Sequence, residues 1–211
     1  MKENTRTLNK KFLSGEKLSW LTCYDYSFAK IIDSTDIDMI LVGDSGGMVT
    51  LGYKDTSPVT MDEMIMLSSA VRRGAPNKFI VGDMPKGSYE VSDEEAVRNA
   101  MRFIKESGCD AVKLEGFNEK ILSRVKSIVD SGIVVIGHIG LTPQSLAQQG
   151  GYRVVGRDKK EILSLQDGVE SLINSGVFSI LLEALPPDLA QKISEKSGVI
   201  IFGIGAGKFV H

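Results

Sequence analysis

The sequence predicts an α/β protein built on a parallel β-sheet. Three observations support this prediction: one form of join between helix and strand recurs, the apolar runs after it have no solvated face, and capped helix starts fall between those runs. Such units fit either an open doubly wound sheet or a closed barrel, because both architectures obey the same connection rules. The order of elements therefore leaves these two architectures open.

The recurring join is an amphipathic segment followed by Ser-Gly and then by an apolar run. Its four copies begin at Glu106, Asp130, Asn174 and Lys196, and read ESGCDAVKLEG, DSGIVVIGHIG, NSGVFSILLEAL and KSGVIIFGIGAG. A glycine just past a helix can take the left-handed conformation that ends it. The apolar runs are too continuous for strands with one wet face, so we predict buried parallel strands.

Helix starts are marked by a capping residue three positions before a carboxylate, which is the pattern of a capping box. The pairs are Thr60 with Glu63, Ser92 with Glu95 and Asp158 with Glu161, and Thr142 before Pro143 marks a further start. Together with the apolar runs nearer the N-terminus, these signals predict strands near 18–24, 38–43, 78–83, 111–115, 133–138, 178–183 and 199–204. No low-complexity linker interrupts the pattern, so we expect residues 1–211 to form one domain.

Composition and charge exclude several classes of function. Apolar residues make up 42% and charged residues 25% of the chain, and the net charge of -2 argues against disorder and against a nucleic-acid partner. The polar N-terminus lacks the apolar stretch of a secretory signal, and no run approaches the ~18 apolar residues of a membrane span. We expect a cytoplasmic protein in which Cys23 and Cys109 are small buried side chains.

Ionisable side chains end five consecutive predicted strands. In chain order they are Asp44, Asp83, Glu115, His138 and Glu183. The carboxyl ends of parallel strands meet on one face in both candidate architectures, so we expect these side chains to converge there. Several buried carboxylates at one mouth need a compensating positive charge.

Three of these carboxylates predict a metal site. Asp44, Asp83 and Glu115 are hard oxygen ligands, Lys113 is one nearby cation, and no thiolate or histidine cluster points to zinc, so we expect Mg²⁺ or a similar ion. Each carboxylate taken singly is explained as well by a helix cap or a surface ion pair. A lone histidine such as His138 is more often a core group than a catalyst, but its place at a strand end favours the site.

Nine segments, in this order, closely resemble ketopantoate hydroxymethyltransferases. They are LTCYDYSFAK, ILVGDSGGMVTLGY, PVTMDEM, AVRRG, VGDMP, AVKLEG, GHIGLTPQS, GGYRVVGR and GIGAG, and they extend from about Leu18 to Gly207. The resemblance implies a (β/α)8 barrel of the phosphoenolpyruvate/pyruvate superfamily and so decides between the two architectures. It also implies a homo-oligomer, a decamer in this family.

The resemblance implies an activity as well. Members of this family transfer a one-carbon unit from 5,10-methylenetetrahydrofolate to 3-methyl-2-oxobutanoate, giving 2-dehydropantoate on the route to pantothenate and coenzyme A. Matched by motif, Asp44 and Asp83 look like the ligands of Mg²⁺ and, through it, of the substrate, and Glu115 looks like the third acidic member of that site. Ser45 and Lys113 match contacts to the keto acid.

Glu183 matches the proposed general base of the family, and His138 matches a residue that lines the same pocket. Glu183 follows the apolar run Ile180–Leu182, and apolar surroundings raise the pKa of a carboxyl group toward the range of a general base near neutral pH. Two alternatives stay open. Glu183 caps the helix that opens near Pro187, or His138 is the base.

The family continues beyond the point that corresponds to His211. We therefore expect the eighth βα unit of the barrel to be missing from this chain. A barrel without that unit exposes two strand edges, which makes an inactive oligomeric scaffold the alternative from another class of function. The nearest enzymatic alternative is a carbon-carbon lyase of the same superfamily acting on an oxo acid, and GHIGLTPQS argues against it.

Overall fold

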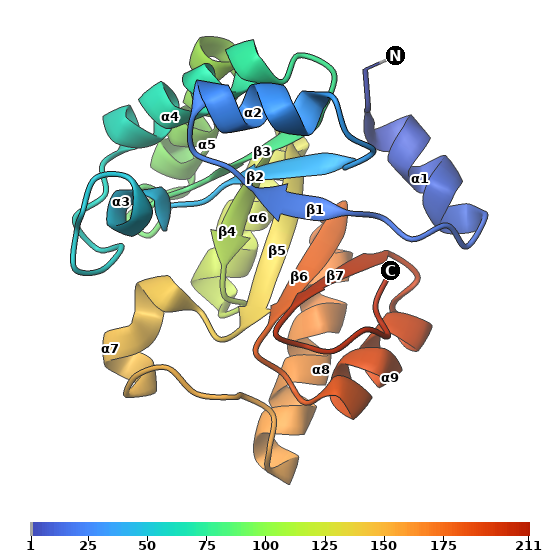
Figure 1. Ribbon diagram of the computed structural model, residues 1–211. Coiled ribbons are helices and arrows are strands. Elements are labelled where there is room, and N and C mark those ends of the chain that lie inside the picture. Colours follow the sequence, from blue (N-terminus) through green and yellow to red (C-terminus); the bar gives the residue numbers. More distant parts are fainter. Residues whose placement is uncertain (1) are drawn as a thin grey trace.

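The computed structural model describes residues 2–211, which are built around a seven-stranded parallel sheet (Figure 1). The strands lie side by side in the order in which they occur in the chain, and each is hydrogen-bonded to the next, as in a nearly closed barrel. They are β1 (Trp20–Thr22), β2 (Met39–Val42), β3 (Phe79–Asp83), β4 (Ala111–Glu115), β5 (Val134–Gly140), β6 (Ser179–Glu183) and β7 (Ile200–Ile204). The predicted parallel sheet is confirmed, with β5 extending two residues beyond the expected end.

One helix precedes β1, and the other helices and turns occur between successive strands, where the longer helices pack on the outside of the sheet (Figure 1). They are α1 (Thr5–Leu13), α2 (Tyr26–Asp33), α3 (Gly46–Val49), α4 (Met61–Gly74), α5 (Asp93–Arg102), the π-helical turn η1 (Phe103–Ser107), α6 (Glu119–Asp130), the 3-10 turn η2 (Pro143–Ser145), α7 (Leu146–Gln149), α8 (Lys159–Asn174) and α9 (Pro187–Ser197). Within residues 2–211, none of these helices combines the length and the apolar character needed to cross a bilayer.

The Ser-Gly joins end helices as predicted. Gly108, Gly132, Gly176 and Gly198 have φ angles of 73°, 86°, 89° and 68°, in the left-handed region that side chains other than glycine rarely enter. Each of these glycines therefore turns the chain from the end of a helix toward the next strand.

The predicted capping boxes are confirmed only in part. Thr60 and Glu63 make both bonds of the box at the start of α4. At the start of α8, Asp158 accepts from the Glu161 amide, but the Glu161 carboxylate accepts from the amides of Gly156 and Arg157 instead of returning to Asp158. The box is incomplete there because the preceding loop offers Glu161 nearer donors.

Successive side chains along each strand point alternately into the barrel and toward the helices, and this alternation divides the core into two layers. The barrel interior is filled by one set of strand residues together with residues that precede the strands: Leu8, Leu18, Met39, Phe79, Val81, Ala111, Ile136, Leu181, Ile200 and Phe202. The intervening strand residues, such as Ile40, Ile80 and Val112, pack against the helices. Because successive strand side chains point to opposite faces, a residue two positions after an inward one also points inward.

Strands β1 and β7 stand at the two edges of the sheet, and the C-terminal segment lies between them. The His211 amide donates to the Ile201 carbonyl at 3.0 Å, and the His211 carbonyl accepts from the Leu18 amide at 3.0 Å. A hollow of about 420 Å³ beside this contact is lined by residues that include Trp20 and Phe202. His211 therefore bridges the seam of the barrel.

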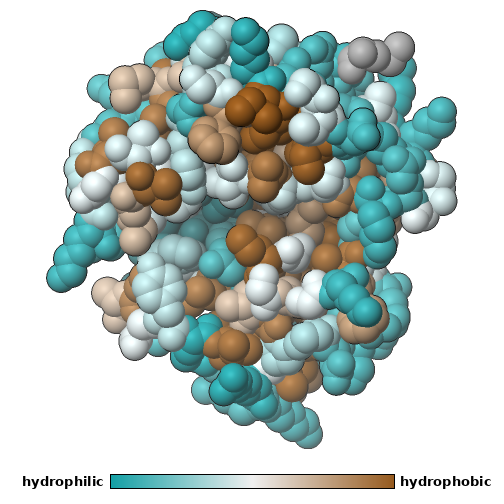
Figure 2. All heavy atoms as spheres, viewed as in Figure 1, coloured by the Kyte–Doolittle hydropathy of each residue, from teal (hydrophilic) through white to brown (hydrophobic). Residues whose placement is uncertain are grey.

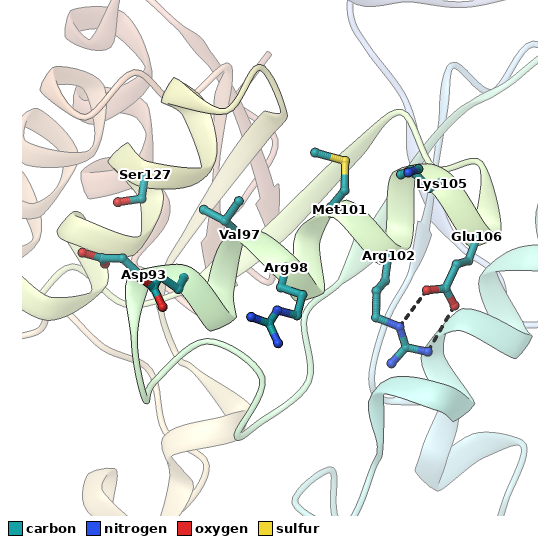
Figure 3. Close-up of a pocket in the computed structure, with 9 residues that line it drawn as sticks. Asp93, Val97, Arg98, Met101, Arg102, Lys105, Glu106 and Ser127 are labelled. Carbon is teal, nitrogen blue, oxygen red and sulfur yellow. Dashed lines mark hydrogen bonds and ion pairs between the residues drawn. The ribbon is translucent and has the colours of Figure 1, made fainter.

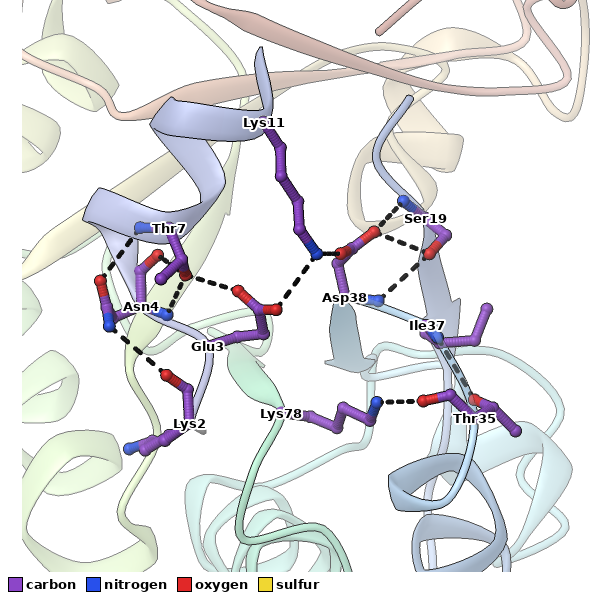
Figure 4. Close-up of polar contacts among 10 residues, drawn as sticks. All are labelled: Lys2, Glu3, Asn4, Thr7, Lys11, Ser19, Thr35, Ile37, Asp38 and Lys78. Carbon is purple, nitrogen blue, oxygen red and sulfur yellow. Dashed lines mark hydrogen bonds and ion pairs between the residues drawn. The ribbon is translucent and has the colours of Figure 1, made fainter. Parts of the chain in front are cut away.

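Helix α1 covers the end of the barrel at which the strands begin. Leu8 of this helix is completely buried in the interior layer. Lys11 forms ion pairs with Asp38, which precedes β2, and with Glu3, and Asp38 also accepts from the amide and hydroxyl of Ser19 (Figure 4). These bonds hold the helix, β1 and β2 together at one end.

Leu8→Ala is expected to destabilise the protein, because it opens a cavity in the interior layer. We expect the free energy of unfolding, measured by urea denaturation, to fall by roughly 2–5 kcal/mol. Leu13→Ala is the matched control, since Leu13 lies on the same helix and is 82% exposed; its effect should stay within about 0.5 kcal/mol. Equal losses in both variants would contradict the assignment of α1 to the core.

Candidate active site

The seven side chains singled out from the sequence converge at the ends of the strands. A cavity of about 240 Å³ is lined by Asp44, Ser45, Asp83, Lys113, Glu115, His138 and Glu183, with apolar and neutral residues between them. Four strands supply most of the charged side chains, because the residue two positions after an inward-facing apolar residue also faces inward. Val81 is followed in this way by Asp83, and Ile136 by His138. The predicted convergence is confirmed.

The register of the sheet decides which charges become neighbours. Lys113 pairs with Asp83 across β3 and β4, and Glu115 pairs with His138 across β4 and β5. Accordingly, Lys113 Nζ lies 2.8 Å from Asp83 Oδ1 and 3.7 Å from Glu115 Oε1. His138 Nδ1 lies 3.4 Å from Glu115 Oε1 and 3.1 Å from Lys113 Nζ. One lysine and one imidazole thus hold these carboxylates together.

Glu183 contacts the same cluster through His138. Glu183 Oε2 lies 3.2 Å from His138 Nε2, although the two groups are not aligned for a hydrogen bond. The expectation of purely apolar surroundings for Glu183 is wrong, because its carboxylate faces an imidazole and its side chain is 23% exposed. The alternative role as a helix cap is also wrong, since α9 is preceded by Pro186 and has no side-chain cap.

Opposing effects act on the proton affinity of His138. Burial and the neighbouring Lys113 lower the pKa of this histidine, but the carboxylates of Glu115 and Glu183 outweigh them and raise it above the ordinary value. The imidazole is completely enclosed between these groups. It therefore lies between the Glu115 carboxylate and the Glu183 carboxylate at the more open side of the cavity.

Asp44 lies on the opposite side of the cluster, directly after β2. Its amide donates to Asp83 Oδ2 at 3.1 Å, and its own carboxylate accepts from Gln144 Nε2 at 2.9 Å. Burial and the charge of Asp83 raise the pKa of Asp44 to about 8. Next to it, the Ser45 hydroxyl is hydrogen-bonded to the Tyr24 hydroxyl at 2.8 Å.

The charges in this cavity fit a divalent cation. Among residues 2–211, no three acidic, histidine or cysteine side chains stand close enough together to hold a metal ion as they are, and Lys113 lies between Asp83 and Glu115. Three buried carboxylates nevertheless face one lysine, and burial raises the pKa of Asp83 as well as that of Asp44. This excess of negative charge on hard oxygen donors suits an ion such as Mg²⁺, whose binding stays a prediction.

A larger hollow lies elsewhere, along α5 on the outside of the barrel (Figure 3). Its volume is about 840 Å³, but three of the charged groups that line it are already paired: Arg102 bonds Glu106 and Asp62, and Asp93 bonds Arg124. It contains no strand-end residue. Chemistry therefore places the candidate active site in the smaller cavity.

Two buried residues near the site were not predicted from the sequence. Gln144 contacts Asp44, and Tyr89 contacts Gln144. Gln144 lies in the segment GHIGLTPQS, whose Pro-Gln pair begins the turn η2 after β5, so a signal for it was present. Tyr89 lies in the loop between β3 and α5, where the sequence offers no comparable pattern.

Solved structures with the same fold belong to several enzymes. The chain superposes on 2,3-dimethylmalate lyase, a PEP mutase/isocitrate lyase superfamily member, with a TM-score of 0.72 and 16% identity, covering 96% of this chain and 72% of the lyase. It superposes equally well, at a TM-score of 0.72 and 12% identity, on phosphonopyruvate hydrolase in complex with oxalate and Mg²⁺, with the same coverage. At these identities the likeness shows a shared barrel fold.

Sequence comparison is more specific. The chain is 48% identical over 208 residues to a 3-methyl-2-oxobutanoate hydroxymethyltransferase of Alkaliphilus metalliredigens, covering 98% of this chain and 73% of that protein. It is 50% identical over 206 residues to the enzyme of the same name from Ignicoccus hospitalis, covering 98% and 78% of the two chains. Residues 2–211 also match the sequence model of the ketopantoate hydroxymethyltransferase family. This chain belongs to the ketopantoate hydroxymethyltransferase family.

Proposed function

We propose that this chain transfers a hydroxymethyl group to 3-methyl-2-oxobutanoate, with 5,10-methylenetetrahydrofolate as the one-carbon donor and 2-dehydropantoate as the product. One observation carries the proposal: all seven residues matched to the family by motif line a single cavity. The relatives that bear the name of this activity are about half identical to the chain. A lyase is disfavoured because the lyase-like resemblance is limited to the fold.

Asp44 and Asp83 would hold the metal ion, and Glu115 would complete the acidic side of its site. When bound, a divalent cation supplies Lewis-acid polarisation of a keto acid's oxygens, which makes the neighbouring C3 proton more acidic. The protein's own part is to keep these carboxylates apart from solvent and from one another. Lys113 does so by its contacts with Asp83 and Glu115.

Proton removal from C3 is assigned to Glu183. Its side chain is more exposed than those of the other charged residues in the cavity, so it can reach a substrate that enters from solvent. His138 contacts its carboxylate and thereby orients it. The negative charge left on the substrate enolate would develop near Lys113, whose buried ammonium group stabilises such charge more strongly than a solvated one would. The enolate carbon then bonds the methylene carbon of 5,10-methylenetetrahydrofolate; both C–N bonds of that carbon break, water supplies the hydroxyl oxygen, and tetrahydrofolate leaves.

Self-association is a further part of the proposal. Phe28 and Ile31 on the outer face of α2 are 65% and 61% exposed, and the surface over this helix is visibly apolar (Figure 2). Exposed apolar residues that lie together are typical of subunit contacts. They support the homo-oligomer implied by the resemblance.

The activity can be tested without folate. The purified protein is incubated in D₂O with 3-methyl-2-oxobutanoate and Mg²⁺, and exchange of the C3 proton is followed by nuclear magnetic resonance. We expect exchange with Mg²⁺ and its loss after chelation, because removing the ion removes the acidifying charge. A folded protein that shows no exchange under either condition would support the inactive scaffold instead.

Asp44→Asn and Asp83→Asn should weaken Mg²⁺ binding more than they weaken folding. Each removes a ligand charge and also relieves repulsion between buried carboxylates. Calorimetric titration should show affinity losses of more than roughly tenfold, since even partners outside the ligand set are worth that much. Asp38→Asn is the matched control, because Asp38 is also buried beside β2 but at its other end. Unchanged Mg²⁺ affinity in both site variants would reject the assignment.

Glu183→Gln should separate binding from proton abstraction. The amide keeps the shape and the hydrogen-bonding ability of the side chain, but it cannot accept the C3 proton. We expect Mg²⁺ and keto-acid binding to persist while exchange falls by roughly 10²- to 10⁴-fold. Near wild-type exchange in Glu183→Gln, together with its collapse in His138→Asn, would make His138 the base.

A further inference from the structure

Gln144 occupies an unusual position for an uncharged side chain at a charged site. It lies in η2, which begins three residues after the end of β5, and it is 6% exposed. From there its side chain reaches across the mouth of the barrel, where Nε2 donates to Asp44 Oδ2 and to the Met84 carbonyl, both at 2.9 Å. Among residues 2–211, no other side chain hydrogen-bonds the Asp44 carboxylate.

The orientation of the Gln144 amide is fixed by its neighbours. Asp44 Oδ2 and the Met84 carbonyl are both acceptors, so the NH₂ group must face them and Oε1 must face the other way. Oε1 there accepts from the Tyr89 hydroxyl at 2.6 Å. Burial raises the pKa of Tyr89 well above its usual value, which keeps this phenol a donor.

The same residues form a closed ring with Glu115. The backbone N–H of Gln144 donates to Glu115 Oε2 at 3.1 Å, and the backbone N–H of Glu115 donates to the Tyr89 hydroxyl oxygen at 3.4 Å. Tyr89 is 2% exposed, and the ring ties the ends of β4 and β5 to the loop after β3. A displacement of Gln144 would therefore move Asp44 and Glu115 together.

We propose that Gln144 and Tyr89 are positioning residues that hold Asp44 and Glu115 in the arrangement that receives the divalent cation. The inference rests on the proposed function, which makes these carboxylates part of the metal site. Neither Gln144 nor Tyr89 lines the cavity itself, so both act through the carboxylates that they hold. Groups that orient metal ligands in this way contribute roughly 10- to 100-fold to metal affinity.

The chemistry of the amide suits this task. A lysine or arginine at position 144 would donate to Asp44 equally well, but its charge would compete with the cation for the carboxylate. A carboxylate there would repel Asp44 and could not donate while ionised. A neutral amide fixes one oxygen of Asp44 and leaves the charge of the group available.

The test compares two glutamines of one loop by titrating magnesium chloride alone into the purified full chain. Gln144→Met removes the bonds to Asp44, Met84 and Tyr89 at nearly constant volume. Gln149→Met is the matched control, because Gln149 bonds only Thr142 and the Gly140 carbonyl and contacts no site carboxylate. We expect Mg²⁺ affinity to fall roughly 10- to 100-fold in Gln144→Met and to stay unchanged in Gln149→Met.

Tyr89→Phe separates positioning from folding, because it removes only the hydroxyl group that bonds Gln144 and leaves the buried ring in place. We expect a smaller loss of Mg²⁺ affinity in this variant. The double variant with Gln144→Met should bind no more weakly than Gln144→Met by itself, because both changes break the same ring. Melting temperatures recorded in parallel show how much each change affects folding. If Gln144→Met does not fold, unchanged affinity in Tyr89→Phe overturns the inference.

The outcomes distinguish the inference from the function on which it rests. A wild-type chain that binds no Mg²⁺ overturns the metal assignment, and the positioning role with it. Wild-type affinity in Gln144→Met overturns the positioning role and leaves the metal site intact. Equal weakening in Gln144→Met and Gln149→Met also overturns it, since the effect would then come from the loop as a whole.

Discussion

Alternation of side chains across a curved parallel sheet is the constraint on which this structure depends. Along β4, Ala111 lies in the apolar interior, and Lys113 and Glu115 follow it on the same inward face at steps of two residues. The strands therefore pass from an apolar base to a charged mouth without any change in conformation. Sheet register then sets the neighbours, so Lys113 meets Asp83 and Glu115 meets His138.

The two ends of the barrel use buried charge differently. At the base, Asp38 is matched by Lys11 and by two bonds from Ser19, so its charge is compensated within the fold. At the mouth, Asp44 and Asp83 share the attraction of Lys113, and their raised pKa values show that compensation is incomplete. Incomplete compensation destabilises the free protein, and it favours the binding of a cation.

Neutral groups around the mouth of the barrel bond the carboxylates without compensating their negative charge. Gln144 and Tyr89 satisfy carboxylate oxygens and backbone groups without adding charge, whereas the His138 ring lies between the carboxylates of Glu115 and Glu183. On the outer face of the sheet, Gly82 allows the Phe103 ring to pack directly against β3, since a Cβ atom at position 82 would lie 2.2 Å from that ring. Close packing of η1 there holds the end of β3, and with it Asp83, in position.

The sequence by itself determined the parallel strands, the helix ends at the Ser-Gly joins and the set of charged residues at the strand ends, because these depend on local periodicity and on glycine conformation. Resemblance was needed to choose the barrel, since alternation fits an open sheet equally well. Only the tertiary structure decided that Glu183 faces His138, that Lys113 stands between Asp83 and Glu115, and that Gln144 reaches Asp44. Such contacts join residues up to 100 positions apart, and sheet register and loop path, which no local pattern encodes, bring them together.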